Sequence, residues 1–369
     1  MDKGKIIKYL RNFILFALLI FLTFWIIFKD QDGEAFLDTM KNANWTYVLI
    51  GCLCMCCFIA LEAFNIGRML KHLGEKSTFL RNVKYAMIGF FFSAITPAAS
   101  GGQPMQIYYM HKDGISIGSS SLTLLINITC ALFVTIALSL FNLIFNYQYM
   151  TPGLTIFFIF GTVINSIAVL LFAIAIFSQK TLDKLMQIAK NILKRLTYGS
   201  MKKVKKSVFS NKKSLVSRIH DRHEKRIKKI EEHVNKYKEN AKYLKENKII
   251  ILKTIILYFI QYTFSYSISY FAYLAVPIKD HIHSWFELTS LQSIVFATVS
   301  GIPSPGAVGV SEAAYIGLLG QVVPAEFLNS VLLLSRVMNF YLFVLLSAIV
   351  VIFAMIKVSR MNKKNEKSN

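Results

Sequence analysis

Charged residues are scarce in this chain, and their scarcity argues against a soluble fold. Asp, Glu, Lys and Arg make up 17% of the 369 residues, whereas about a quarter is typical of soluble domains. Apolar side chains take their place, at 54% of the sequence with 30 phenylalanines. They come in runs of about 20 residues, the length that a membrane-spanning helix needs. The composition therefore predicts a polytopic membrane protein.

Motifs of common enzyme and metal sites are also missing. The sequence contains no P-loop, which argues against ATP hydrolysis. His281 and His283 have no third ligand nearby, and His220 and His223 lie far from any acidic residue in a span. The five cysteines lie in apolar segments, where those of Cys52–Cys57 would point to several faces of one helix. We therefore expect no catalytic residue, no metal site and no cofactor.

Uninterrupted apolar runs predict the spanning helices. The first run, 12–28, follows four basic residues and is not followed by a small-residue cleavage site, which is typical of an uncleaved signal anchor with its N-terminus inside. The predicted full spans are 12–28, 46–70, 118–145, 153–177, 249–275 and 327–356.

Two further apolar regions, 82–110 and 286–320, are interrupted by proline and glycine. Neither half of either region is long enough to cross a bilayer comfortably, so each predicts a re-entrant helical hairpin. The expected fold is an all-α polytopic membrane protein with about six full spans and two re-entrant hairpins in an inverted-repeat arrangement.

The loop charges support this topology. The stretch 180–248 holds 22 Lys and Arg against seven acids, a net charge of +15, as expected of a cytoplasmic loop. The loop 146–152 contains no basic residue and is expected outside. Treating either broken region as a full crossing would move basic loops to the wrong side. The hairpins are therefore expected to enter the membrane from opposite faces.

These patterns divide the chain into four parts. Both termini are expected in the cytoplasm, and the Lys-, Asn- and Ile-rich composition favours the cell (inner) membrane of a bacterium with AT-rich DNA. The parts are an N-terminal membrane half (1–177) with the hairpin 82–110, a basic insert (178–248), a C-terminal membrane half (249–357) with the hairpin 286–320, and a basic tail (358–369).

The breaks in the two hairpins share a spacing, Pro97-x-x-x-Gly101 and Pro305-x-x-x-Gly309. Corresponding Pro/Gly interruptions in two oppositely oriented halves point to a transporter substrate site, because the broken backbone frees polar groups at membrane depth. The alternative is a pair of proline-kinked helices without a transport role. We predict a substrate path that includes Pro97, Ser100, Gly101, Gly102, Gln103, Gln106, Pro305, Gly309, Glu312 and Arg336.

Ionisable residues in spans are costly and usually face an interior or a cavity. Glu312 and Arg336 are expected to pair, although Glu312 could instead serve as a local helix cap. Glu62 is deep in its span, whereas Arg68 and Glu287 fit the membrane interface, where a long side chain can reach water.

Polar residues that follow the first break are a second group. The amides of Gln103 and Gln106 could bind a phosphate or glycerol group, or could equally hydrogen-bond the broken backbone. Secondary candidates for the path are Glu62, Arg68, Tyr108 and Asn339.

The basic insert contains a heptad seam of apolar residues on a charged helix. This seam favours a helix that rests on the membrane or on its own protein over one that binds a specific partner. The basic charge also attracts anionic lipid headgroups, so no nucleic-acid partner is needed to explain it. The seam residues are Ile227, Ile230, Val234, Tyr237, Ala241 and Leu244.

At its breaks the sequence resembles the lysylphosphatidylglycerol synthase transmembrane family, also called flippase-like proteins. The resemblance covers almost the whole chain, and the matching stretches are TPAASGGQPMQIYYM (96–110), IPSPGAVGVSEAAYIGLL (302–319) and LLLSRVMNFY (332–341). In that family the membrane domain is thought to move aminoacylated phosphatidylglycerol between leaflets. The resemblance implies functional positions at Gly101, Gly102, Pro305, Gly309, Glu312 and Arg336.

Two departures from the family pattern bear on the substrate. Where many members carry an acid and an arginine after the first break, this chain has Gln103 and Gln106, which argues against the same headgroup. After Lys357 only a short basic tail follows, so we expect no synthase domain and no lysyltransferase activity.

The favoured function is a flippase for a membrane phospholipid, either aminoacyl-phosphatidylglycerol or a related anionic lipid. Two alternatives stay open. One is a membrane component of lysylphosphatidylglycerol synthesis that works with a separate synthase partner. The other is a non-transporting scaffold that recruits a partner or a second copy of itself.

Overall fold

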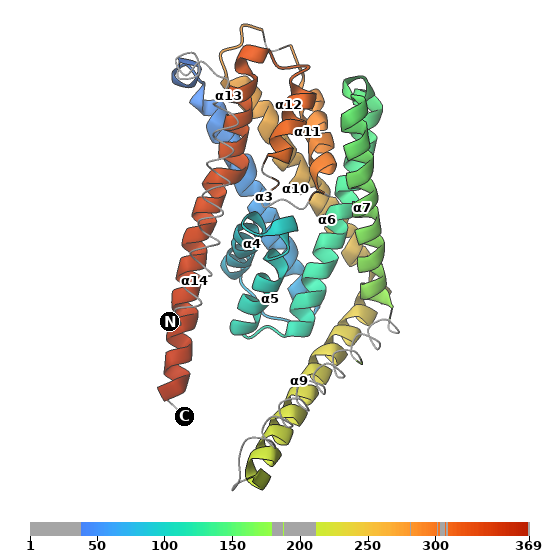
Figure 1. Ribbon diagram of the computed structural model, residues 1–369, viewed down its shortest axis with the longest axis vertical. Helices are drawn as coiled ribbons and strands as arrows, with labels where there is room; N and C mark the ends of the chain where they lie inside the picture. Colours follow the sequence, from blue (N-terminus) through green and yellow to red (C-terminus); the bar gives the residue numbers. More distant parts are fainter. Residues whose placement is uncertain are drawn as a thin grey trace.

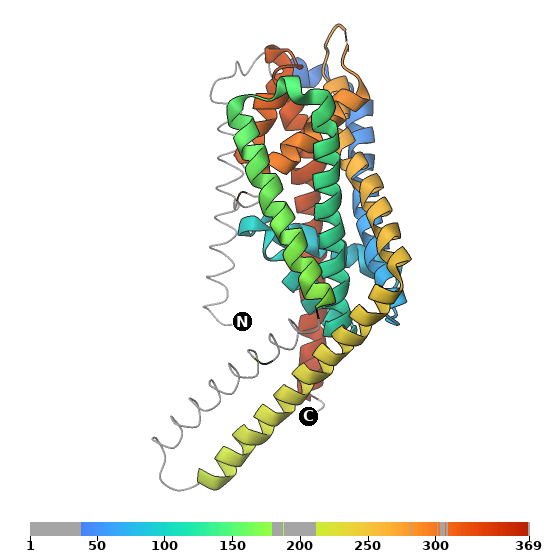
Figure 2. The same ribbon diagram turned by 90° about the vertical axis from the view of Figure 1, so that its right-hand side faces the viewer.

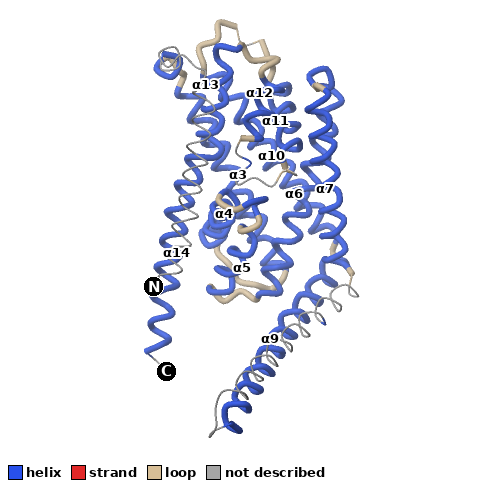
Figure 3. The backbone as a smooth tube through the Cα atoms, viewed as in Figure 1, coloured by secondary structure: helices blue, strands red, loops and turns tan. Residues whose placement is uncertain are grey.

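The computed structural model describes residues 38–178, 187, 212–280, 282–300, 302, 307 and 309–367. Every regular element in these residues is helical, as the tube in Figure 3 shows. This confirms the predicted all-α class. The predicted span 12–28 and the path residue Pro305 lie outside the described residues.

Five helices in the described part of the chain are long and apolar enough to cross a membrane, and they match five of the six predicted spans. The fifth is continuous from Ala325 to Met361 and includes a π-helical stretch, η4 (Val337–Tyr341). The others are α3 (Trp45–His72), α6 (Ile117–Asn146), α7 (Pro152–Phe177) and α10 (Lys248–Ala275), and the fifth joins α13 (Ala325–Arg336) to α14 (Leu342–Lys367).

Local sequence explains where several spans begin. The side chain of Asn44 accepts the amide of Thr46 at the start of α3, and that of Ser116 accepts the amide of Ser119 at the start of α6. Such side chains satisfy amides that have no partner within the helix. Pro152 opens α7, where its missing N–H costs no hydrogen bond.

The two broken regions form short helices that do not cross the bundle. The first hairpin consists of α4 (Phe79–Ala94), a short turn η1 (Pro97–Ala99) and α5 (Gly102–Lys112). The second consists of α11 (Trp285–Val299) and α12 (Val310–Leu319). Figure 1 shows α4 and α5 in the lower half of the bundle and α11 and α12 in the upper half. The hairpins thus enter from opposite ends, as the loop charges predict.

The hairpins are surrounded by spanning helices. In the contacts between elements, α4 packs on α3, α5 and α14, while α11 packs on α6, α7, α10 and α12. Two hydrogen bonds from asparagine side chains hold α11 in place. Asn142 Nδ2 donates to Ser293 Oγ at 2.8 Å, and Asn165 Nδ2 donates to Ser300 Oγ at 2.6 Å. The opposite side of α7 exposes Ile156, Phe157, Ile159 and Phe160, as expected of a lipid-facing surface.

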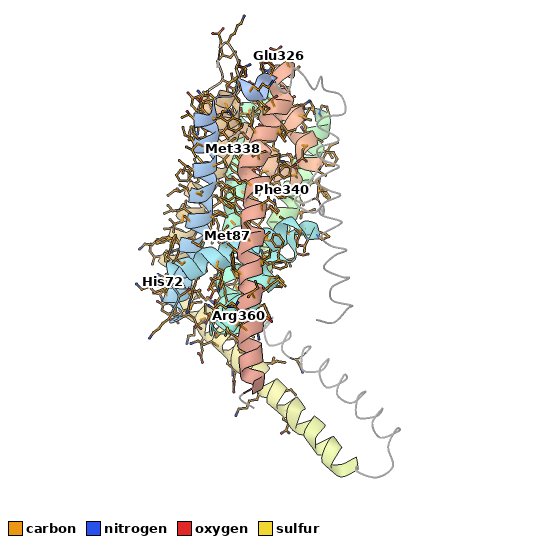
Figure 4. The ribbon with its side chains drawn as sticks, turned by 90° about the vertical axis from the view of Figure 1, so that its left-hand side faces the viewer. His72, Met87, Glu326, Met338, Phe340 and Arg360 are labelled. Carbon is orange, nitrogen blue, oxygen red and sulfur yellow. The ribbon has the colours of Figure 1, made fainter. Side chains whose placement is uncertain are left out.

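The longest span connects the two ends of the bundle. Figure 4 places Glu326 of α13 at one end and Arg360 of α14 toward the other, with His72 of α3 toward the same end as Arg360. The charged helix α9 (Lys212–Glu246) extends from the same end of the bundle as Arg360, as Figure 2 shows, and we call this end the basic end.

The C-terminal part of α9 docks on the bundle. Tyr237 donates from its hydroxyl to the carbonyl of Ala175 at 3.2 Å, and Asn240 Nδ2 donates to Ser119 Oγ at 2.9 Å. Ala241 and Leu244 are buried. This part of the predicted seam therefore packs on its own protein, the interpretation that the sequence favours.

Candidate functional site

The first break is exposed and strained. Residues 97–100 are all exposed, and they connect α4 to α5, which lie in the lower half of the bundle in Figure 1. Ala98 and Ala99 have φ values of 51° and 53°, in the left-handed region that costs an L-residue about 1–2 kcal/mol. Strain of this kind is kept where the surrounding structure enforces it, commonly at functional sites.

Thr96 enforces the turn. Its hydroxyl donates to the carbonyl of Phe92 at 2.6 Å and accepts the amide of Gly101 at 2.9 Å, so one side chain connects the end of α4 to the start of α5. No side chain caps α5, and among the described residues the amides of Gly102 and Gln103 have no acceptor. The positive end of the α5 dipole is thus free at the break.

Glycine lets α4 and α5 touch. A Cβ on Gly102 would lie 2.2 Å from Ser93 Oγ and 3.0 Å from the carbonyl oxygen of Gly89. The side-chain amide of Gln106 occupies the space beside Gly89 and donates to the carbonyl of Tyr85 at 3.1 Å. Gln106 therefore bonds the backbone inside α4 and not the predicted broken backbone, and it also borders a cavity.

That cavity has a volume of about 150 Å³ and lies among α3, α5, α6 and α10. Its wall is unusually polar for the middle of apolar helices. The polar residues are Glu62 of α3, Gln103 and Gln106 of α5, Asn127 of α6, and Tyr258, Gln261 and Tyr262 of α10. The fold thus brings together three predicted path residues, Glu62, Gln103 and Gln106.

Glu62 is the one acidic residue on the wall of this cavity, which we call the Glu62 cavity. Its Oε2 accepts the hydroxyl of Tyr258 at 2.9 Å and Nε2 of Gln261 at 3.1 Å. Both donors are neutral, and no Lys, Arg or His of the described residues forms an ion pair with Glu62. Glu62 is therefore held in place by hydrogen bonds and has no counter-ion among the described residues.

The second break contains a closed ion pair. Ala307 and Gly309 have φ values of 53° and 85°, so this turn also uses the left-handed region. Glu312 Oε2 accepts the amide of Gly309 at 2.6 Å and contacts Ser311 Oγ at 3.0 Å. Glu312 Oε1 lies 2.8 Å from Arg336 Nε. The predicted Glu312–Arg336 contact is confirmed, and Glu312 also caps α12, which was the alternative.

Arg336 stands at a change of helix geometry. Its side chain is 13% exposed, and its guanidinium carbon lies 5.8 Å from the centre of the Phe340 ring. The π-helical stretch Val337–Tyr341 follows it, a feature common at functional sites. Asn339, a secondary candidate, lies in this stretch and makes a long contact of 3.5 Å with Ser335 Oγ.

The predicted path residues fall into two groups rather than one. Ser269 of α10 lies 3.4 Å from Ser335, next to Arg336, whereas Gln261 of the same helix borders the Glu62 cavity. A rise of about 1.5 Å per residue separates these two positions by about 12 Å along α10. Aromatic rings of Tyr262, Tyr266 and Phe296 contact one another between them.

Two secondary candidates point away from the cavity. Arg68 donates to the carbonyl of Ile250 at 3.3 Å and to the hydroxyl of Thr254, so it joins α3 to the start of α10. Tyr108 is 43% exposed and packs edge-on against Tyr109, with a ring-centre distance of 5.2 Å. Neither residue borders the Glu62 cavity.

Each hairpin is anchored at its base by a carboxylate. Asp113, after α5, accepts the hydroxyl of Tyr85 at 2.6 Å and pairs with Lys84. Burial opposes ionisation of Asp113, but the hydrogen bonds from Lys84 and Tyr85 outweigh it and lower the pKa of this carboxyl below its ordinary value. At the other end of the bundle, Glu287 accepts the hydroxyl of Tyr149 at 2.6 Å and contacts His283 Nδ1 at 3.0 Å.

Sequence reasoning missed several polar residues of the cavity wall. Asn127, Tyr258 and Gln261 lie in long apolar helices, and only ionisable residues were singled out there. A signal existed, because a buried amide in a span needs a hydrogen-bond partner just as an acid does. Their meeting with Glu62, however, depends on how α3, α6 and α10 pack.

Comparisons with known proteins agree with this architecture. The family model described as the lysylphosphatidylglycerol synthase TM region matches residues 12–347. A UPF0104 membrane protein of Archaeoglobus fulgidus is 23% identical over 335 residues, which cover 90% of this chain and 94% of that protein. A UPF0104 membrane protein of Pyrococcus horikoshii is 24% identical over 349 residues, 94% of this chain and 96% of that protein.

Proposed function

This chain belongs to the lysylphosphatidylglycerol synthase TM region family, and we propose that it moves a phospholipid headgroup across the bilayer. The observation that carries the proposal is the exposed break of the first hairpin beside a polar cavity, among helices of spanning length. Irregular backbone at membrane depth is tolerated where it lines a cavity or is buried in protein. The headgroup would follow this polar surface while its tails stay in the lipid.

The start of α5 suits the phosphate of the headgroup. The amides of Gly102 and Gln103 and the side chain of Gln103 are hydrogen-bond donors at the positive end of a helix. They are neutral groups, so they would solvate a phosphate without holding it by a full charge. Weak, multiple contacts of this kind favour passage over retention. The substrate class we expect is a phospholipid that presents a phosphate to this end of α5, either related to aminoacyl-phosphatidylglycerol or anionic.

The second break would act as the opposite wall of the path. Glu312 accepts a hydrogen bond from the amide of Gly309 and forms an ion pair with Arg336, so the charges of Glu312 and Arg336 neutralise each other. Opening this pair would release a guanidinium that can hydrogen-bond a phosphate in two places. We therefore assign Arg336 the role of a second phosphate contact during translocation.

A separate pocket at the basic end of the bundle fits an anionic headgroup that is bound outside the path. It has a volume of about 480 Å³, and Ile176, Phe177 and Ala241 form its apolar part. Lys238, Lys242, Lys245 and Lys248 surround it, with Glu246 as the one acid. Basic residues beside an apolar surface attract anionic lipids at the membrane boundary. We propose that this end faces the cytoplasm, together with α9 and the C-terminal tail.

Transport is tested by leaflet exposure of a labelled phospholipid in proteoliposomes. The native chain should speed the loss of outer-leaflet asymmetry relative to protein-free vesicles. Arg336→Ala should reduce the rate strongly, and Arg336→Lys should restore only part of it, because lysine cannot bind a phosphate through two parallel hydrogen bonds. Glu287→Gln, at the outer base of the second hairpin, is the matched control. Equal rates for the native chain, Arg336→Ala and empty vesicles would refute the proposal.

A further inference from the structure

Glu62 lies in the middle of an apolar spanning helix and has no counter-ion among the described residues. Glu312, which is buried, has Arg336 as its counter-ion, whereas Glu62, which is partly buried, has only neutral donors in the described residues. A carboxylate within a membrane is costly and normally pairs with a cation or marks an ion pathway. An acid in this setting either takes up a proton or pairs with a cation.

The geometry of Glu62 leaves one oxygen free. Tyr258 and Gln261 both donate to Oε2, and no described residue donates to Oε1. Because two donors fix the carboxylate from one side, its other oxygen has a set position on the cavity wall. This is the arrangement of a ligand that is oriented before its cation arrives.

Neighbouring amides are also without partners. Gln261 is 1% exposed and its Oε1 accepts no hydrogen bond from the described residues, while Asn127 is 2% exposed and neither of its side-chain polar atoms has a partner among them. Buried amides without partners cost about 1–3 kcal/mol each, so their persistence calls for a ligand. Together with Glu62 Oε1 they supply three oxygen acceptors around one small space.

The size of the cavity limits the ligand. A volume of about 150 Å³ corresponds to about five water molecules at about 30 Å³ each. A small cation with a few waters fits, and hard cations prefer carboxylate and amide oxygens. A single carboxylate neutralises one charge, which favours a monovalent cation over a divalent one.

No other charge near Glu62 competes for this role. The titratable side chains that face it are Tyr258 and Tyr262 of α10, with Cys130 of α6 behind Tyr258. The contributions of α5 to the cavity, Gln103 and Gln106, are neutral. Arg68 of α3 is bound to α10 through Ile250 and Thr254.

We propose that the Glu62 cavity binds a small monovalent cation, a proton or Na⁺, at Glu62 Oε1. Gln261 and Asn127 would complete the site through their amide oxygens. Because Gln103 and Gln106 line the same space, an occupied site would also contact the first hairpin. This inference goes beyond the lipid path, and it is tested by binding alone, so it can fail while transport stands or stand while transport fails.

The first test is thermal unfolding of the purified full chain in detergent, with NaCl replaced by choline chloride at constant ionic strength. Na⁺ should raise the midpoint of the native chain, since a ligand that binds only the folded state stabilises it. Glu62→Gln, which keeps the side-chain shape and can still accept the Tyr258 hydroxyl, should lose that rise. Glu287→Gln is the matched control, because Glu287 also accepts a tyrosine hydroxyl but lies outside the cavity.

The second test distinguishes a proton from Na⁺. Infrared difference spectra between low and high pH should show the carbonyl band of a protonated carboxyl, lost in Glu62→Gln and kept in Glu287→Gln, if the ion is a proton. A Na⁺ effect lost in Glu62→Gln identifies sodium. Absence of both signals overturns the proposal, as does a Glu62-dependent stabilisation that appears only with an amine-bearing lipid.

A third variant protects the test against misfolding. Asn127→Leu removes two unpartnered polar atoms, so the protein without added ion should be as stable as the native chain or more so. Its response to the ion should nevertheless fall. An unchanged response would remove Asn127 from the site.

Discussion

The two hairpins have the same arrangement of two half-helices joined by a break, but they differ at this break, which we call the tip of the hairpin. Each has a break with left-handed residues and a second half-helix that begins inside the bundle. In the second hairpin, Glu312 caps that helix and Arg336 neutralises the acid. In the first, no side chain caps α5 and the break is exposed. One helix end is thus satisfied by the protein itself, and the other is open to a ligand.

The bases of the hairpins are alike where the tips differ. Asp113 accepts Tyr85 and pairs with Lys84 at one end of the bundle, and Glu287 accepts Tyr149 and contacts His283 at the other. Each base combines an acid, a tyrosine hydroxyl and a basic side chain. The comparison indicates that the bases anchor the hairpins, and our proposal assigns the function to the tips.

The largest expected effect on stability comes from removing the Glu312–Arg336 ion pair at the tip of the second hairpin. Glu312→Ala leaves Arg336 as a buried unpaired charge and should destabilise the protein by about 3–5 kcal/mol. The double variant Glu312→Ala/Arg336→Ala should lose less than the sum of the single losses, because it removes both charges. Unfolding in detergent measures the cycle. Additive losses would show that the pair does not stabilise the second tip.

Adding a methyl group at the tip of the first hairpin should push its two half-helices, α4 and α5, apart. Gly102→Ala places a methyl group 2.2 Å from Ser93 Oγ and should cost about 1–3 kcal/mol. Gly153→Ala is the matched control, since nothing lies within 4 Å of its added Cβ. Thermal unfolding of both variants makes the comparison. Equal midpoints would contradict the close contact of α4 and α5.

Relieving strain at the open tip should have a smaller effect of opposite sign. Ala98→Gly removes the cost of a left-handed alanine and should stabilise the protein by about 1 kcal/mol or less. Ala86→Gly, inside α4, should destabilise it by about 0.5–1 kcal/mol. Denaturant unfolding distinguishes the signs. A loss of stability in both variants would argue that Ala98 is not strained.

The smallest expected effect concerns the base of the first hairpin. Because hydrogen bonds lower the pKa of Asp113, its carboxylate stabilises the fold above the ordinary carboxyl pKa, and this contribution is lost as pH falls through the folded-state pKa. The loss is expected below about pH 4. Asp113→Asn should be less stable than the native chain at neutral pH, and the difference should shrink in acid. A constant difference across this pH range would exclude the linkage.

Much of the architecture follows from local sequence. Apolar length predicts the five described spans, and the interruptions at Pro97–Gly101 and before Gly309 predict the hairpins. Loop charges predict that the hairpins enter from opposite ends. The Glu312–Arg336 contact is predictable because two buried charges of opposite sign lower each other's cost.

Other parts of the candidate site were beyond such reasoning. Glu62 is separated from Tyr258 and Gln261 by 196 and 199 residues, and nothing local in either helix specifies the partner. Arg68 could reach water by its position, yet it bonds the backbone of α10. In each case the rotation of one helix against another decides the contact.

The sequence by itself determined the broken segments and their opposite directions, because proline, glycine and loop charge act locally. Only the tertiary structure decided that the first tip is open and the second closed, and that Glu62 faces a cavity without a counter-ion. The physical reason is that helical periodicity states which residues share a face but not which helix that face meets.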